Sequence, residues 1–103
     1  MNEPSYQEKF WQIISLIPSG SVATYGQVAE LAGLPSMARA VGRTLSQLPK
    51  DTQLPWFRVI NAKGEISFPK DSPPYQRQRS LLEADGVVFI RGKVPLRKYK
   101  WQP

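Results

Sequence analysis

The spacing of apolar and polar residues predicts a series of short helices in the first half of the chain. Apolar side chains recur at helical spacing between Tyr6 and Ile17. Ser5 and Glu8 have the spacing of a capping box, which places the start of this helix at Ser5. Pro18 and Gly20 follow the last apolar position and predict its end.

Two further helices follow, joined by a tight turn. A second capping box, Thr24 to Gln27, opens a helix that ends at Gly33, and we expect Ser36 to cap a third helix that runs to about Leu48. Four apolar side chains of this third helix lie within about 80° of one another on a helical wheel: Met37, Val41, Leu45 and Leu48. Arg39, Arg43 and Ser46 fall on the opposite side. The third helix is therefore predicted to bury one stripe and to present two arginines.

Two short helices that meet at a glycine-containing turn, the second with an exposed basic face, form a helix-turn-helix pattern. Many small helical domains contain such a corner. By itself, the pattern is only a weak indication of DNA binding.

The second half of the chain predicts a small β element and one more helix. Leu54 to Ile60 is an apolar run, Asn61 to Gly64 is a turn, and Glu65 to Phe68 is expected to return as a second strand. This pair would form a small wing beside the helices. A last helix is predicted from Tyr75 to Ala84 with Leu81 and Leu82 facing inward, stopped by Gly86. Val87 to Ile90 is expected to be a short strand, and a basic, aromatic tail follows.

Composition narrows the possible chemistry. The chain has 103 residues, enough for one domain, and it contains neither cysteine nor histidine. Disulfides, Cys/His zinc sites, thiol nucleophiles and Ser-His-Asp triads are thereby excluded. No apolar run is long enough to span a membrane, and the start lacks the features of a signal peptide, so we expect a cytoplasmic protein.

The charge is unevenly distributed. Residues 1–50 carry four basic and three acidic side chains, a net of +1, whereas residues 51–103 carry ten basic and five acidic side chains, a net of +5. Such a balance favours a polyanionic partner, nucleic acid first. The alternative is a solvated basic surface that maintains solubility.

The segment Pro55-Trp56-Phe57-Arg58-Val59 is the most informative part of the chain. Arg58 lies within an apolar run, so a buried Arg58 requires a partner. Trp56 is either a core aromatic or a flat face on which a base stacks. Glycine-rich phosphate loops and paired carboxylate motifs are absent from the sequence.

These segments resemble the O(6)-alkylguanine-DNA alkyltransferases, and more closely their non-catalytic relatives, the alkyltransferase-like proteins. Three motifs carry the resemblance: Ile17 to Gly20 running into Thr24 to Ala29, Ala38 to Gly42, and Pro55 to Asn61 followed by Gly64. It extends from about residue 8 to residue 86 and continues in the tail. The transferases have Pro-Cys-His-Arg-Val where this chain has Pro55-Trp56-Phe57-Arg58-Val59. Trp56 thus stands where the transferases have the cysteine that accepts the alkyl group.

The resemblance implies a role for each matching residue. Arg39 would enter the base stack from the minor groove, Tyr25 would crowd the 3′ phosphate, and Gly42 would let the helix approach the DNA backbone, with Ala38 and Arg43 beside them. The lesion pocket would be lined by Trp56, Tyr25, Leu45, Pro55 and Val59, with the Val59 backbone contacting the base. Arg58 would brace the pocket wall. For Arg43, phosphate contact and a plain surface role both stay open.

The chain also departs from the family pattern. Phe57 replaces a histidine, Asp85 replaces a glutamate, and Leu48 or a neighbour replaces an asparagine near the end of the recognition helix. Relatives can carry a base-probing arginine near position 69, where this chain has Pro69; Lys70 and Lys63 are the candidates to replace it.

The expectation is a mainly helical, winged-helix-like domain over residues 1–103, similar to the C-terminal domain of the alkyltransferases. The resemblance implies a monomer that binds O(6)-alkylguanine in double-stranded DNA, flips the base and flags it for nucleotide excision repair proteins, with no catalytic residue, cofactor or metal. Two alternatives are a winged-helix regulator that reads sequence, and a residual glycosylase or hydrolase that uses Asp85 or Glu83 as base.

Overall fold

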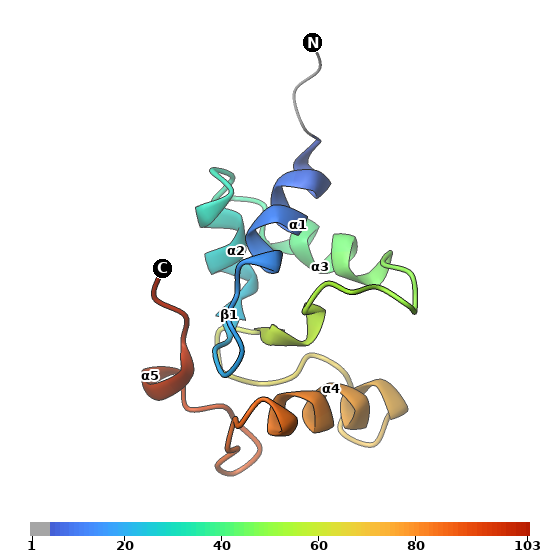
Figure 1. The fold of residues 1–103 in the computed structure, drawn as a ribbon, viewed down its shortest axis with the longest axis vertical. Coiled ribbons are helices and arrows are strands. Elements are labelled where there is room, and N and C mark those ends of the chain that lie inside the picture. Colours follow the sequence, from blue (N-terminus) through green and yellow to red (C-terminus); the bar gives the residue numbers. More distant parts are fainter. Residues whose placement is uncertain (1–4) are drawn as a thin grey trace.

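The structure, a computed structural model, describes residues 5–103 and is mainly helical (Figure 1). Its elements in chain order are α1 (Tyr6–Ser15), β1 (Ala23–Thr24), α2 (Tyr25–Leu31), α3 (Ala38–Ser46), the 3-10 turn η1 (Trp56–Arg58), β2 (Val59–Ile60), α4 (Pro73–Ala84) and α5 (Leu96–Tyr99). The predicted helical character is confirmed. Within residues 5–103, no helix combines the length and the apolar character needed to cross a membrane.

Two of the three predicted N-caps are present. The Ser5 hydroxyl accepts a hydrogen bond from the Glu8 amide at 3.2 Å, and the Thr24 hydroxyl accepts one from the Gln27 amide at 3.1 Å. Each bond satisfies an amide that has no partner within its own helix. The Gln27 side chain does not return to Thr24. It donates instead to the Trp101 carbonyl at 2.8 Å and so ties the C-terminal tail to α2.

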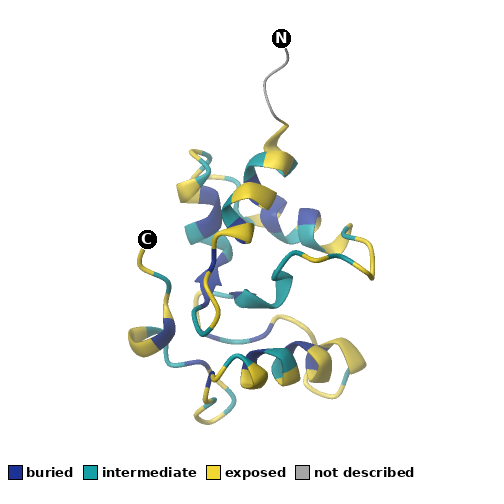
Figure 2. Cartoon of the chain, viewed as in Figure 1, coloured by how far each residue is buried: buried dark blue, intermediate teal, exposed yellow. Residues whose placement is uncertain are grey.

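The core consists of two clusters of buried side chains, one on each side of a small sheet. The first joins α1, α2 and α3, and its largest members are Phe10, Ile14, Ile17, Val28 and Val41. The second lies under α4 and the tail, and it includes Val22, Ile60, Leu82, Val87 and Val94. Figure 2 shows the buried faces of α1 and α4 turned inward.

The sheet that separates the clusters is not the predicted wing. Val59 and Ile60 pair in parallel with Ala23 and Thr24, and Glu65 to Phe68 does not form a strand. The expected turn is present, because the Asn61 amide donates to the Glu65 carbonyl at 3.0 Å. Both strand residues of β2 are buried, so their most favourable partner is another buried segment and not a solvent-facing return strand.

The strand predicted from Val87 to Ile90 is also wrong, since only Ile90 forms an isolated bridge, to Lys93. Position 64 requires a glycine, because the backbone there passes very close to Val94. Its φ is +81°, and an added Cβ would collide with the Val94 carbonyl. Close backbone approach takes the place of a regular ladder here, with the Val94 amide donating to the Gly64 carbonyl at 2.8 Å.

The third helix is shorter than predicted at both ends. The Met37 amide closes a turn onto the Leu34 carbonyl at 2.9 Å, so α3 begins at Ala38 and Ser36 does not cap it. The helix ends at Ser46 instead of Leu48, because the residue before a proline disfavours helical geometry and Pro49 follows Leu48.

The two faces of α3 are arranged largely as predicted. Of the four apolar positions expected to form its buried stripe, only Val41 is fully buried. Ala40 and Thr44 complete the buried face. The expected exposure of Arg39, Arg43 and Ser46 is confirmed.

The last long helix begins two residues before the predicted start. Ser72 caps α4 through its hydroxyl, which accepts from the Tyr75 amide at 3.4 Å, and Gly86, with φ +93°, follows its end. Leu82 is fully buried, and Leu81 is half-buried. The tail then returns to the sheet, where Lys100 bridges to Val22 in parallel.

Candidate nucleic-acid interface

The exposed face of α3 carries the residues predicted to contact DNA. Ala38, Arg39 and Gly42 line a shallow depression of about 410 Å³ together with Tyr25 and Ser67. Tyr25 is the first residue of α2, and its hydroxyl donates to the Ser67 hydroxyl at 3.1 Å. Arg39 and Tyr25 are thereby placed on one concave surface. Arg43 is exposed on the same helix and does not line the depression.

Gly42 has no structural reason inside the protein to be glycine. An added Cβ would lie 4.0 Å from the Tyr25 ring, which is ordinary van der Waals contact. Glycine within a helix costs about 1 kcal/mol relative to alanine. A helix that carries this cost without an internal clash to avoid is consistent with close approach of an external molecule at Gly42.

A small, partly open cavity of about 100 Å³ adjoins this surface. It is lined by Tyr25, Gly42, Leu45, Ser46, Trp56, Val59, Phe68 and Gln78. Four of the five residues predicted for the pocket are therefore brought together: Tyr25, Leu45, Trp56 and Val59. Pro55 is the exception. It precedes η1 as its N-cap residue and is not among the lining residues.

The turn that holds Trp56 is braced by a partly buried ion pair. Arg58 donates to Asp85 twice, from Nε to Oδ2 at 2.6 Å and from Nη2 to Oδ1 at 3.0 Å, and its Nη1 donates to the Ile17 carbonyl at 3.0 Å. The Arg58 guanidinium holds the pKa of the Asp85 carboxyl below its ordinary value; the Ser19 hydroxyl and the Gly20 backbone amide act in the same direction. The predicted need of Arg58 for a partner is confirmed.

The aromatic rings of the turn pack against each other and against this arginine. The Trp56 and Phe57 rings meet edge to face with their centroids 5.9 Å apart, and the Arg58 guanidinium carbon lies 5.1 Å from the Phe57 centroid. The Phe57 side chain therefore packs within the turn, between Trp56 and Arg58.

Gln78 is a site residue that the sequence analysis missed. Its Nε2 donates to the Phe57 carbonyl at 3.0 Å and to the Val59 carbonyl at 3.1 Å, so it fixes the backbone on both sides of Arg58. Gln78 is 3% exposed. The signal was present: Gln78 lies between Tyr75 and Leu82 on the buried side of α4, and a polar residue on an apolar face requires partners.

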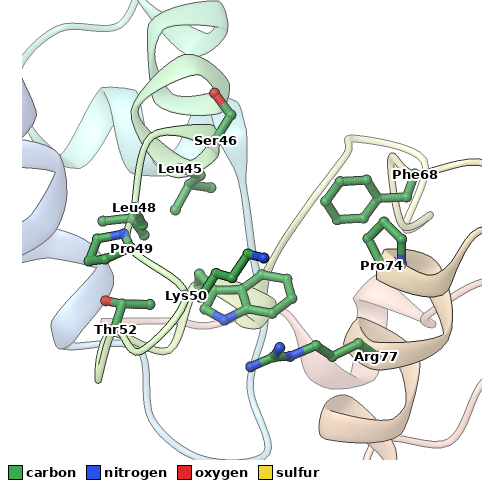
Figure 3. A pocket seen from close by; sticks show the side chains of 10 residues that line it. Leu45, Ser46, Leu48, Pro49, Lys50, Thr52, Phe68, Pro74 and Arg77 are labelled. Carbon is green, nitrogen blue, oxygen red and sulfur yellow. The ribbon is translucent and has the colours of Figure 1, made fainter.

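Neither lysine suggested as a substitute for a base-probing arginine lines the cavity. Lys63 lines a separate depression with Lys93 and Ile90, and the Lys70 amine lies beside Gly92. The cations that line a pocket together with Trp56 are instead Lys50 and Arg77. They line an open cleft of about 230 Å³ that continues outward from the cavity (Figure 3).

The fold and this site define the class of protein. Residues 5–87 match the family model described as the 6-O-methylguanine DNA methyltransferase DNA-binding domain. The chain is 49% identical over 96 residues to a DNA base-flipping protein of Vibrio parahaemolyticus, covering 92% of this chain and 94% of the relative. It is 38% identical to alkyltransferase-like protein 1 of Schizosaccharomyces pombe, with both chains fully covered.

Solved structures agree with these relatives. The S. pombe protein in complex with damaged DNA containing O6-carboxymethylguanine superposes with a TM-score of 0.89 at 38% identity over the full length of both chains. A Mycobacterium tuberculosis OGT in complex with DNA gives a TM-score of 0.70 at 32% identity, covering 82% of this chain and 51% of that one. The chain belongs to the methyltransferase DNA-binding-domain family and, within it, to the alkyltransferase-like proteins.

Proposed function

We propose that this protein recognises O(6)-alkylguanine in duplex DNA, flips the damaged base out of the stack and transfers nothing. The observation that carries the proposal is the cavity at Trp56, which is lined from α3 on one side and from α4 on the other and adjoins the face that bears Arg39. The relatives named as base-flipping and alkyltransferase-like proteins support it.

The arrangement suits a base-flipping protein. Extruding a nucleotide costs a few kcal/mol in lost stacking and pairing, and a side chain that fills the vacated space offsets part of this cost. Arg39 is exposed on α3, and its planar guanidinium is able to stack and to donate hydrogen bonds at once. Tyr25 lines both the outer depression and the inner cavity, so it stands on the path that a base takes between them. We propose minor-groove docking of α3, with Ala38, Gly42 and Arg43 against the backbone.

The chain is poorly equipped for group transfer. It has no cysteine to accept an alkyl group and no histidine to activate a nucleophile, and Trp56 and Phe57 occupy the corresponding positions. The two carboxylates that the hydrolase alternative would use, Asp85 and Glu83, do not line the Trp56 cavity. Asp85 is held by Arg58, and Glu83 is exposed and 3.6 Å from Arg79. These features support a binding protein and not an enzyme.

A titration with matched duplexes tests the proposal. The duplexes differ only in carrying guanine or O(6)-methylguanine at one position. We expect a preference for the lesion that persists at higher salt, whereas binding to the undamaged duplex weakens steeply because it rests on phosphate contacts. Equal affinity for both duplexes would overturn the assignment. Discrimination among undamaged sequences would indicate the regulator, and release of base or alkyl group during long incubation would indicate the residual enzyme.

Because the proposed complex leaves the lesion intact, removal must fall to other proteins, and we propose that these belong to nucleotide excision repair. The test compares excision of a lesion-bearing oligonucleotide by a reconstituted excision system with and without this protein. Stimulation is expected for the lesion duplex only. An unchanged excision rate at saturating protein would remove this part of the proposal.

We further propose that residues 1–103 act as a single DNA-binding unit, as a monomer in the cytoplasm. Both core clusters border the same small sheet, which supports one cooperative unit. Sedimentation of a labelled lesion duplex with increasing protein is expected to give a complex of one chain per lesion. A complex of two chains per lesion would contradict this.

A further inference from the structure

The cleft beyond Trp56 is continuous with the cavity proposed for the base. Cavity and cleft share four lining residues, Leu45, Ser46, Trp56 and Phe68. Additional apolar walls come from Leu48 and Pro49 after α3 and from Pro74 at the start of α4. A substituent on a base held in the inner cavity therefore has an apolar passage to the outside.

Two cations line this passage from opposite sides. Lys50 belongs to the loop after α3, and Arg77 belongs to α4; Figure 3 shows both side chains reaching toward the middle of the cleft. Among residues 5–103, no carboxylate lines the cleft. The ion pairs found within residues 5–103 join Arg58 to Asp85 and Arg79 to Glu83, so neither Lys50 nor Arg77 is paired there.

We propose that this cleft receives the O(6) substituent and that Lys50 and Arg77 select substituents ending in a carboxylate. The inference rests on the proposed function and adds the class of adduct. The apolar walls accommodate the methylene of a short carboxyalkyl chain. The guanidinium of Arg77 matches a carboxylate with two parallel hydrogen bonds, and the flexible Lys50 amine adds a point charge.

Lys50 and Arg77 would also attract DNA phosphates, and that simpler role makes a different prediction. A phosphate contact strengthens the binding of every duplex by the same factor, whatever the adduct. A contact to the adduct changes only the ratio between a charged substituent and a neutral one of the same shape. The ratio therefore separates the two roles.

The experiment compares O(6)-carboxymethylguanine with its neutral isostere, O(6)-carbamoylmethylguanine, in otherwise identical duplexes. O(6)-methylguanine and undamaged duplexes are included. The ratio of the two dissociation constants is measured for the wild type, for Lys50→Gln, Arg77→Gln and the double variant, and for the control pair Lys93→Gln and Arg97→Gln. The control residues are exposed and line neither the cavity nor the cleft.

We expect the preference for the carboxylate to fall about fivefold for each cleft variant, the upper range for a solvent-exposed ion pair. The control variants are expected to weaken all duplexes without changing the ratio. An unchanged ratio in the double cleft variant would overturn the inference while leaving the lesion preference for O(6)-methylguanine intact. Loss of that lesion preference in the wild type would instead contradict the proposed function itself.

Discussion

Replacing Asp85 by Asn removes the charge from the ion pair that braces the Trp56 turn while keeping the shape of the side chain. The Asp85 carboxylate accepts two bonds from Arg58, at 2.6 and 3.0 Å, and one from the Ser19 hydroxyl at 3.1 Å. The Arg58 and Asp85 side chains are only 16% and 11% exposed, so solvent screens the pair weakly.

Hydrogen bonds to charged groups contribute about 1.5–3 kcal/mol each, and an asparagine retains one acceptor for Arg58. Arg58 also keeps its bond to the Ile17 carbonyl. We therefore expect Asp85→Asn to lower the free energy of unfolding by about 2 kcal/mol at neutral pH, which corresponds to roughly 10 °C in melting temperature for a chain of this size. Urea unfolding followed by circular dichroism measures the difference.

The pH dependence of this difference gives a second, independent check. Arg58 lowers the pKa of Asp85 in the folded state below its ordinary value near 3.8. The stabilisation is therefore fully present above the unfolded pKa and is lost as the pH falls through the folded pKa. Wild type and Asp85→Asn should differ most between about pH 5 and 7 and converge in more acidic solution.

Glu83→Gln is the matched control, because it removes the same charge near the end of the same helix. Glu83 is 3.6 Å from Arg79 in an exposed pair, which contributes at most about 0.5 kcal/mol. Equal stability of Asp85→Asn and wild type at neutral pH would refute the claim that the Arg58–Asp85 ion pair stabilises the fold. A deficit that stays constant from neutral to acidic pH would show that the loss comes from packing and not from the charge.

Further predictions concern the residues proposed to contact DNA and the cavity. Arg39→Ala should weaken binding to the lesion duplex by about 1–3 kcal/mol in a titration at unchanged melting temperature; equal affinity would refute its role. Gly42→Ala should raise thermal stability by about 0.5–1 kcal/mol yet reduce DNA affinity, and tighter binding by this variant would contradict close backbone approach at that position. Gln78→Leu should cost about 2 kcal/mol in urea unfolding, because the carbonyls of Phe57 and Val59 lose their donor; a neutral effect would mean that water replaces it. Trp56→Cys should transfer little or no radiolabelled methyl from lesion DNA, because a thiol of ordinary pKa beside a phenylalanine is mostly protonated, and transfer at the rate of an authentic transferase would overturn this view.

Local interactions were predictable from the sequence, because the residues that make them lie within one turn of each other. The caps at Ser5 and Thr24 were predicted from residues three positions apart. The exposure of Arg39 and Arg43 follows from helical periodicity alone. Ser36 failed as a cap because the preceding turn, and not the hydroxyl, set where α3 begins.

Pairing between distant segments was not predictable in the same way. A two-residue strand carries too little pattern to identify its partner, so β2 was assigned to a hairpin with Glu65 to Phe68, whereas it pairs in parallel with β1. For the residues after Ile90, the sequence predicted only a basic, aromatic tail. In the folded protein, the Trp101 amide donates to the Val22 carbonyl at 2.7 Å.

The same distinction between local and long-range interactions applies to the candidate site. The residue types follow from the sequence: a tryptophan in the Pro55–Val59 segment, an arginine in an apolar run that needs a partner, and no cysteine or histidine. Long-range packing in the folded chain makes Asp85 the partner, sets Gln78 against the backbone around Arg58 and leaves Pro55 outside the cavity. It also placed Lys50 and Arg77 across one cleft. The physical reason is that these contacts join residues far apart in the chain, and packing of the two core clusters against the sheet sets their distances.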